Sequence, residues 1–231
     1  MTESGRVPSP YPLDRSFYLR DSLTVAKELL GKLIVRLSES GPLVCRIVET
    51  EAYNEEDPAS HSFRGRTSRN APMYQPGGVA YVYFIYGMYN CFNVVTDREG
   101  YGSAVLIRAA EPLSGLHAMW RNRFPGTEPP GMPDTLTHMP EDRRLRCAVV
   151  SLANGPGKLA HSLGLNVARH SGMSLLSGEL TIQDDGYSPD RVVGDVRIGI
   201  SVAQEREWRF FIAENGSVSR SRVRPIDRED R

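Results

Sequence analysis

The stretch that decides the fold reads RIVETEAY at residues 46–53, HSFRGRTSRN at residues 61–70 and YVYFIYGMYNCFN at residues 81–93. The first part is an apolar strand pattern that carries carboxylates, and the second is a polar loop rich in arginine. The third is a tyrosine cluster that predicts a β-hairpin with its tip near Gly87. Acid–base groups, anion-binding groups and flat rings thus occur close together, which indicates chemistry on a nucleobase.

The first strand predicts a pair of carboxylates on one face. Side chains alternate between the faces of a strand, so Glu49, Glu51 and Tyr53 point to one side if the strand is regular. Two neighbouring carboxylates repel each other, which raises one pKa and leaves a base beside an acid-like partner. A solvent-facing edge with two glutamates of no function is the alternative. The spacing alone does not choose between Glu49 and Glu51.

The hairpin predicts an aromatic surface. A tyrosine at the tip cannot be buried by its own hairpin, so Tyr86 either packs on a neighbour or is offered to a partner. Tyr81 and Tyr83 share one face and can stack on a flat ligand. An aromatic-rich hydrophobic core is the alternative for these two residues.

The charge distribution is local rather than global. The chain has 28 basic and 28 acidic residues, and a net charge of zero counts mildly against a nucleic-acid binder. Three arginines and no acidic residue lie between His61 and Met73, however, and arginine suits contacts with phosphates and bases. A general preference for arginine over lysine explains the composition equally well. The glycines before Lys158 precede a predicted helix and could hold a phosphate, although the spacing is not that of a Walker A loop.

Several protein classes are excluded by pattern. The 231 residues suit a single domain, and no apolar run approaches the roughly 20 residues of a membrane span. The first residues lack an apolar segment, so we expect no signal peptide. The three cysteines lie far apart without a CxxC pair, and no HxxxH or HExxH pattern occurs, so we expect no metal site. A reducing cytoplasm is the expected compartment.

The remaining patterns predict a strand-rich chain with short helices. We expect a flexible N-terminal arm at residues 1–14, a single domain at residues 15–217 and a charged, frayed tail at residues 218–231. Residues 124–142 are rich in proline and predict a long mobile loop. Helices are expected at residues 21–31, 115–123 and 154–163, and residues 143–152 are helical or irregular. Strands are expected at residues 32–37, 43–51, 78–85, 90–96, 103–109, 180–183, 196–200 and 209–213.

Together these motifs resemble the 3-methyladenine (alkyladenine) DNA glycosylase family, of the type that also occurs in animals. The matching segments are RIVETEAY, the loop at residues 61–70, YVYFIYGMY with Asn93, LIRAAEPL at residues 106–113, GPGKL at residues 155–159 and RIGI at residues 197–200. They follow one another in order from about residue 16 to residue 213. The tyrosine-rich motifs are long and unusual, so chance matching is improbable.

The resemblance implies a fold and an activity. The fold would be a single mixed α/β (α+β) domain around a curved, largely antiparallel sheet, with a protruding β-hairpin. The activity would be removal of alkylated or deaminated purines from double-stranded DNA by hydrolysis of the N-glycosidic bond, which leaves an abasic site. Because no lysine matches a Schiff-base nucleophile, the enzyme would be monofunctional. It would need no metal or organic cofactor, contact no membrane, and act as a monomer in the cytoplasm, on the nucleoid in a bacterium.

The resemblance also implies residue roles. Glu51 would be the general base, which selects it over Glu49, and Arg108 would help to hold the attacking water. Tyr53 and Tyr83, with His61 beside them, would form the walls around the flipped base, and Asn93 would exclude the amino group of guanine. Tyr86 would enter the minor groove as a wedge. The residues expected to contact DNA phosphates are Arg66, Arg69, Lys158 and Arg197.

Two departures from the family pattern and two rival functions remain. The segment between Tyr53 and His61 is one residue shorter than in animal members, which affects contacts with the base edge. Zero net charge predicts weaker non-specific DNA binding than a basic homologue has. The rivals are a non-catalytic nucleic-acid-binding module, which would not need Glu51, and a hydrolase of free nucleosides, which would not need an exposed Tyr86.

Overall fold

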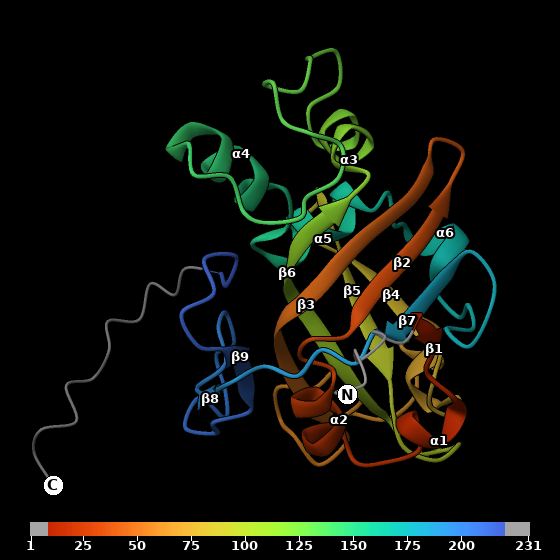
Figure 1. The fold of residues 1–231 in the computed structure, drawn as a ribbon. Coiled ribbons are helices and arrows are strands. Elements are labelled where there is room, and N and C mark those ends of the chain that lie inside the picture. Colours follow the sequence, from red (N-terminus) through yellow and green to blue (C-terminus); the bar gives the residue numbers. More distant parts are fainter. Residues whose placement is uncertain (1–8, 220–231) are drawn as a thin grey trace, which may run out of the picture.

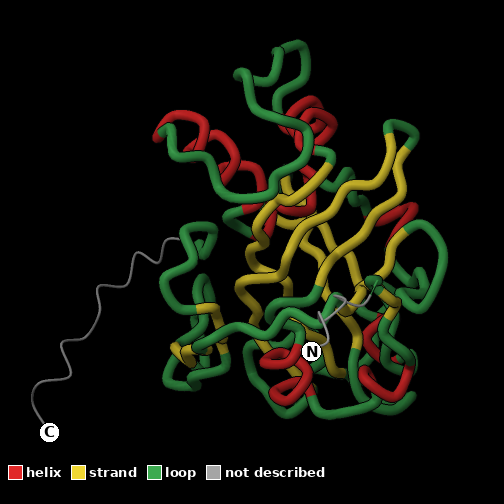
Figure 2. The backbone as a smooth tube through the Cα atoms, in the orientation of Figure 1, coloured by secondary structure: helices red, strands yellow, loops and turns green. Residues whose placement is uncertain are grey.

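The computed structural model describes residues 9–219 of the 231-residue chain. In this part of the chain a nine-stranded, antiparallel sheet forms the centre, with short helices around it (Figures 1 and 2). The strands are β1 (Tyr11–Pro12), β2 (Leu33–Ser38), β3 (Gly41–Asn54), β4 (Ala80–Ile85), β5 (Tyr89–Val95), β6 (Ser103–Ser114), β7 (Leu180–Asp184), β8 (Val192–Asp195) and β9 (Arg209–Ile212). The helices are α1 (Arg15–Tyr18), α2 (Ser22–Glu28), the 3-10 helix η1 (Ala71–Tyr74), α3 (Leu116–Arg123), α4 (Arg143–Ala153), α5 (Pro156–Ser162) and α6 (Val167–His170). The expected mixed α/β fold is confirmed.

Strand β3 is the central strand of the sheet. The main strand order is β1-β7-β2-β3-β6-β5-β4, so β6 runs along one edge of β3. On the other edge, β2 pairs with residues 41–46 and β9 pairs with residues 49–51. The segment that carries Glu49 and Glu51 therefore has a neighbouring strand on both sides, and both carboxylates are buried. The alternative of two glutamates on a solvent-facing edge is wrong.

One face of the sheet is the hydrophobic core. Paired residues on adjacent strands point to the same face, and Ala52, Val105, Val94 and Ala80 form such a row across β3, β6, β5 and β4. All four are fully buried, in one apolar cluster with residues of α2, α4 and α5. Because side chains alternate along each strand, the neighbours of these four residues in sequence point to the other face of the sheet.

The tip of the β4–β5 hairpin holds a tyrosine in an unusual conformation. Tyr86 and Gly87 both have positive φ, at 55° and 69°, and the Met88 N–H donates to the Ile85 carbonyl at 3.3 Å. Positive φ at both central residues is the geometry of a type I′ turn, which suits the twist of a hairpin. The side chain of Tyr86 is 75% exposed. The predicted hairpin is therefore present, with Tyr86 projecting from it.

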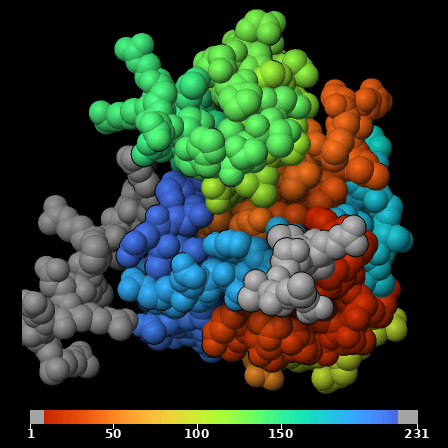
Figure 3. Space-filling model, in the orientation of Figure 1, coloured from red at the N-terminus to blue at the C-terminus, as the bar shows by residue number. Residues whose placement is uncertain are grey.

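The proline-rich segment at residues 124–142 is anchored near its middle. Met132 is buried in the core, and the Leu136 N–H donates to the Leu113 carbonyl at 2.8 Å. Asp142 then caps α4 by accepting from the Leu145 N–H. Figure 3 shows this green segment and α4 as a lobe at the top of the molecule. Contacts across 132–136 thus tie down a segment that composition alone describes as mobile.

Three local expectations differ from the structure. The strand predicted at residues 196–200 is wrong, since the strand β8 ends at Asp195 and Gly199 has a φ of 81°, outside the extended region. Part of the predicted N-terminal arm belongs to the sheet, because Tyr11–Pro12 pairs with β7. The start of the predicted tail is also held, because the Ser219 N–H donates to Glu49. The expectations for residues 1–8 and 220–231 lie outside the described residues.

Glu49 connects the centre of the sheet to the end of the described chain. Its buried carboxylate accepts from Arg209 Nε at 2.6 Å, from Arg108 Nε at 3.3 Å and from the Ser219 N–H at 2.7 Å. These partners belong to β9, β6 and the segment after β9. A buried carboxylate is tolerated only when it is paired in this way, so the pairs hold these three parts of the chain together.

We expect Glu49→Gln to lower the free energy of unfolding by about 3 kcal/mol, because it leaves buried arginines with one counter-charge fewer. Urea unfolding measures this change. The control is Glu28→Gln, which removes a carboxylate from the exposed Glu28–Arg20 ion pair and should cost less than about 1 kcal/mol. Equal effects of the two substitutions would contradict the structural role of Glu49.

Candidate active site

A cavity of about 450 Å³ lies on the sheet face opposite the core. Its floor follows from the strand register. Glu51 pairs with Leu106, Leu106 with Asn93, and Asn93 with Tyr81, so one row crosses β3, β6, β5 and β4. Every member of this row lines the cavity. Its volume falls in the range of small-molecule sites.

Neighbouring positions and three loops complete the walls. Two pairs flank the floor row on the same face, Tyr53 with Ala104 and Tyr83 with Cys91. The rim is formed by the hairpin, by the segment after β3 and by the segment after β8. The rim residues that line the cavity are Pro58, Ala59, His61, Ile85, Tyr86, Ile198, Gly199, Ile200, Ser201 and Val202. The cavity therefore joins a rigid floor to loops from distant parts of the chain.

The carboxylate of Glu51 is held by three donors. Its Oε1 accepts from the Ile198 N–H at 2.8 Å and lies 3.2 Å from Arg108 Nη1, and its Oε2 accepts from the Tyr53 hydroxyl at 2.7 Å. Burial opposes the charge of Arg108, but the carboxylates of Glu51 and Glu49 raise its pKa. A carboxylate fixed in this manner at the wall of a cavity can take a proton from water and stabilise positive charge.

Glu49 and Glu51 share Arg108 but differ in surroundings. Arg108 contacts both carboxylates, so the two side chains lie close together, although the register between β3 and β6 shifts on both sides of Glu49 and the strand is not regular there. The guanidinium between them offsets their repulsion. Only Glu51 lines the cavity, so the structure distinguishes two glutamates that the spacing could not.

The aromatic residues of the cavity are neutral. Burial raises the pKa of Tyr53 and of Tyr83 and raises the pKa of Tyr81 to about 12. Burial, with the charge of Arg69, lowers the pKa of His61, so its ring is uncharged at pH 7. Neutral rings suit stacking with a flat ligand.

Hydrogen bonds and ring contacts fix this aromatic cluster. The His61 Nδ1 lies 2.9 Å from the Tyr81 hydroxyl, and the His61 ring meets the Tyr83 ring edge-on at 4.6 Å between centroids. Asn93 Nδ2 donates to the Tyr81 carbonyl at 3.0 Å, which sets the orientation of its amide. Because the side chains hold one another, the cavity is shaped before any ligand enters.

None of the four expected phosphate contacts lines the cavity, and three of them lie nearer the surface than Arg197 does. Arg66 and Arg69 are exposed, and Arg69 Nη2 donates to the Phe84 carbonyl at 2.9 Å, beside the hairpin. Lys158 is half-buried in α5 and donates to Asn154 Oδ1 at 2.8 Å. Burial and the charge of Arg123 lower the pKa of Lys158. None of these residues lines the cavity.

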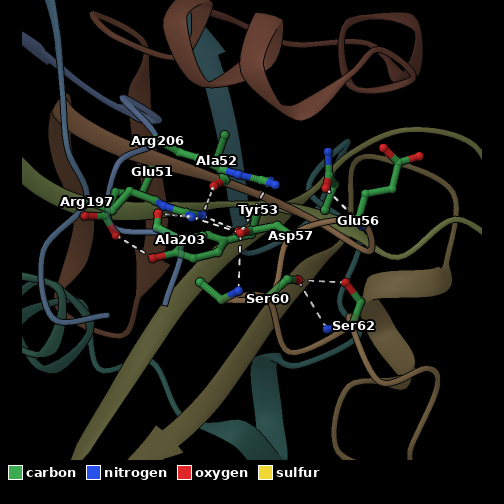
Figure 4. A network of polar contacts seen from close by, with 12 residues as sticks. Glu51, Ala52, Tyr53, Glu56, Asp57, Ser60, Ser62, Arg197, Ala203 and Arg206 are labelled. Carbon is green, nitrogen blue, oxygen red and sulfur yellow. Dashed lines mark hydrogen bonds and ion pairs between the residues drawn. The ribbon is translucent and has the colours of Figure 1, made fainter. Parts of the chain in front are cut away.

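Arg197 differs most from its expected position. It is buried and paired with Asp57, and its Nη1 donates to the Ala52 carbonyl at 3.0 Å (Figure 4). This guanidinium is therefore engaged within the protein rather than offered to solvent.

Three contributors at or beside the site were not predicted from the sequence. Asp57 follows two other acidic residues and carries no motif that marks it, and the Ile198 N–H is a backbone donor, which carries no sequence signal. Cys91 could have been found, since it lies two residues before Asn93 on the same strand face.

Among residues 9–219, no helix combines the length and hydropathy that a membrane span requires. The same residues contain no group of three or more histidine, cysteine, aspartate or glutamate side chains arranged to hold a metal ion.

Comparison with known proteins identifies the family. Residues 16–216 match the model of the methylpurine-DNA glycosylase (MPG) family. A protein of Methanoculleus marisnigri is 42% identical over 212 residues, which cover 90% of this chain and 98% of that protein. A protein of Alkaliphilus oremlandii is 39% identical over 214 residues, with 90% and 98% covered. Both are named "Putative 3-methyladenine DNA glycosylase". The resemblance in the sequence motifs is thus confirmed, and the chain belongs to the methylpurine-DNA glycosylase family, as a DNA-repair glycosylase for alkylated purines.

Proposed function

We propose that the enzyme flips a damaged purine out of duplex DNA into the cavity and hydrolyses its N-glycosidic bond with a water activated by Glu51. The observation that carries this proposal is the composition of one cavity. A carboxylate–arginine pair, Glu51 and Arg108, lies there beside the rings of Tyr53, His61 and Tyr83. A glycosidic bond cannot be reached inside a stacked duplex, so the nucleotide must rotate out to meet these groups.

The aromatic walls favour recognition by stacking. Stacking on an aromatic side chain contributes about 1–3 kcal/mol per base and requires no particular pattern of hydrogen bonds. Tyr53 and Tyr83 can therefore accept several lesions, and we propose 3-methyladenine, 7-methylguanine, hypoxanthine and ethenoadenine as substrates. Asn93 lies in the cavity floor between Leu106 and Tyr81, where its amide can exclude the exocyclic amino group of guanine.

The reaction needs a base on the sugar side. As the water oxygen bonds to the anomeric carbon, its proton passes to Glu51 and the electrons of the glycosidic bond leave with the purine. Positive charge develops on the sugar, and the carboxylate stabilises it. Arg108 helps to hold the water, while the Tyr53 hydroxyl and the Ile198 N–H keep the carboxylate in place. Alkylated purines already carry positive charge and leave readily, whereas neutral lesions also need a proton.

The products are a free base and an abasic site. No lysine lines the cavity in the described residues, which supports a monofunctional enzyme without a Schiff-base step. We propose that the protein acts as a monomer on double-stranded DNA, in the cytoplasm and, in a bacterium, on the nucleoid. The exposed ring of Tyr86 at the hairpin tip would fill the gap that the flipped nucleotide leaves.

We expect Glu51→Gln to slow base release by at least about 10²-fold, because it removes the general base. Single-turnover release from a duplex with one hypoxanthine or ethenoadenine measures this rate. The control is Glu49→Gln, which removes the other carboxylate on Arg108, outside the cavity, and should retain base release in the folded protein. If Glu51→Gln retains the wild-type rate, Glu51 is not the base. If the wild-type protein binds the duplex but releases no base from it, and none from methylated DNA, the result would favour a non-catalytic binding module.

We expect Tyr86→Ser to slow base release from duplex DNA by about tenfold while part of the duplex affinity remains, because the gap is no longer filled. Single-turnover release measures it. As a control, the deficit should shrink for a lesion in an unpaired bulge, where no base pair has to open. An unaltered rate on the duplex would exclude the wedge role.

We expect Lys158→Ala to weaken duplex binding and to make its salt dependence shallower by about 0.9 in log–log slope, the change for one phosphate contact. Binding titrations at several salt concentrations measure the slope. The matched control is Lys27→Ala. Lys27 lies on α2, on the core side of the sheet, where its ammonium group packs over the Phe210 ring. Its removal should leave the salt slope unaltered. An unchanged slope for Lys158→Ala would remove this lysine from the DNA interface. A free-nucleoside hydrolase would show no such duplex binding.

A further inference from the structure

Arg197 is bound on one edge by a buried carboxylate. Its Nη1 and Nη2 both pair with Asp57, with 3.0 Å from Nη2 to Oδ1, and Nη1 also donates to the Ala52 carbonyl (Figure 4). Both side chains of the pair are inaccessible to solvent. This fork geometry fixes the plane of the guanidinium.

The faces of the same guanidinium contact aromatic rings. Its central carbon lies 4.7 Å from the centroid of the Tyr53 ring and 5.2 Å from that of Trp208. Arg206 lies 4.6 Å from the Trp208 ring and 3.6 Å from Asp57. Two guanidinium groups thus contact the Trp208 ring, and that of Arg197 also contacts the ring of Tyr53, which lines the cavity. Cation–π contacts of this kind gain strength when they are desolvated.

The Arg197–Asp57 pair also joins two parts of the cavity rim. Asp57 directly precedes Pro58 and Ala59, and Arg197 directly precedes Ile198. These neighbours line the cavity, and the Ile198 N–H donates to Glu51 at 2.8 Å. A displacement of Arg197 would therefore move a stacking wall and a donor to the catalytic carboxylate together.

We propose that Arg197, held by Asp57, is a positioning residue of the base pocket: it keeps the Tyr53 ring and the Ile198 N–H in place and does not contact DNA phosphate. This inference rests on the proposed function of the cavity. A displacement of about 1 Å in a positioned group can cost about 10²-fold in rate. The effect of Arg197 therefore belongs to the steps after the base has entered the pocket, whereas a phosphate contact acts on binding to any duplex.

Two duplexes separate these steps. One carries hypoxanthine or ethenoadenine, and the other carries a tetrahydrofuran abasic analogue at the same position, which offers no base to stack. For Arg197→Met we expect base release to fall by about tenfold or more and the preference for the lesion duplex over the abasic duplex to fall with it. Affinity for the abasic duplex and its salt slope should stay at the wild-type values. Lys158→Ala should show the opposite pattern, with a shallower slope on both duplexes.

Arg197→Lys provides a conservative variant. It keeps a positive charge opposite Asp57 but loses the planar face and the bidentate fork. If Arg197→Met does not fold, we expect Arg197→Lys to fold. We expect Arg197→Lys to retain only part of the wild-type rate of base release. Full restoration would mean that charge alone matters, which would overturn the positioning of Tyr53 through a planar contact.

Arg46 offers a matched control elsewhere in the fold. It pairs with both oxygens of Asp185, and its guanidinium lies 4.2 Å from the Tyr187 ring centroid. Arg46→Met thus removes the same kinds of contact at a place that does not line the cavity. It should lower thermal stability and leave base release per folded molecule unaltered. If it slows base release as much as Arg197→Met does, only general stability is at work and the proposal fails.

The remaining outcomes are distinct. Unaltered base release by Arg197→Met would overturn the proposal, and so would a shallower salt slope on the abasic duplex, since that is the mark of a phosphate contact. If the wild type releases no base from any duplex, the glycosylase mechanism fails instead. The preference for lesion over abasic duplex then still tests Arg197, because it requires stacking and not chemistry.

Discussion

The structure depends on the compensation of two carboxylates buried in its longest strand. Glu49 and Glu51 lie in a part of β3 that has strands on both sides, and the side chains of both are buried. Ionised groups removed from water cost several kcal/mol each unless donors replace the lost hydration. The chain provides such donors from β6, from β9 and from the segments that follow β8 and β9. Within residues 198–219, Ile198, Arg209 and Ser219 each donate a hydrogen bond to one of these two side chains.

Glu49 and Glu51 are both buried carboxylates held by hydrogen-bond donors, but their surroundings differ. Glu49 is enclosed by protein donors and holds the sheet together. Glu51 also has three donors, but it lies at the wall of the cavity. The strand register explains this difference, because Glu51 stands in the row that continues through Leu106 to Asn93. A shift of two positions along one strand therefore separates an enclosed carboxylate from one at the wall of the cavity.

Local pattern was enough to predict much of this site. Alternation along strands placed Glu51 with Tyr53 and predicted the hairpin with Tyr86 at its tip, since these features depend only on near neighbours in sequence. The resemblance selected the further residues that share the cavity. The position of Arg197 could not be predicted from the sequence, because a guanidinium suits a phosphate and a buried aspartate equally well. Its partner Asp57 is also 140 positions away in the chain. The strand expected at residues 196–200 is absent for a related reason. Polar and apolar residues do alternate there, but the positive φ at Gly199 and the contact with β3 determine the conformation.

The left-handed backbone at Tyr86 affects how much conformational entropy the hairpin turn would lose on binding a duplex. A bulky residue at positive φ is strained by about 1–2 kcal/mol, and here the hairpin turn imposes that conformation while the protein folds. The turn is consequently formed before any duplex arrives, so its backbone conformation does not have to be ordered at the moment of contact. Loops that order only on binding lose conformational freedom at that step, about 1–2 kcal/mol for each residue. If Tyr86 enters DNA as proposed, a pre-strained turn transfers this loss from the encounter with DNA to the folding of the protein.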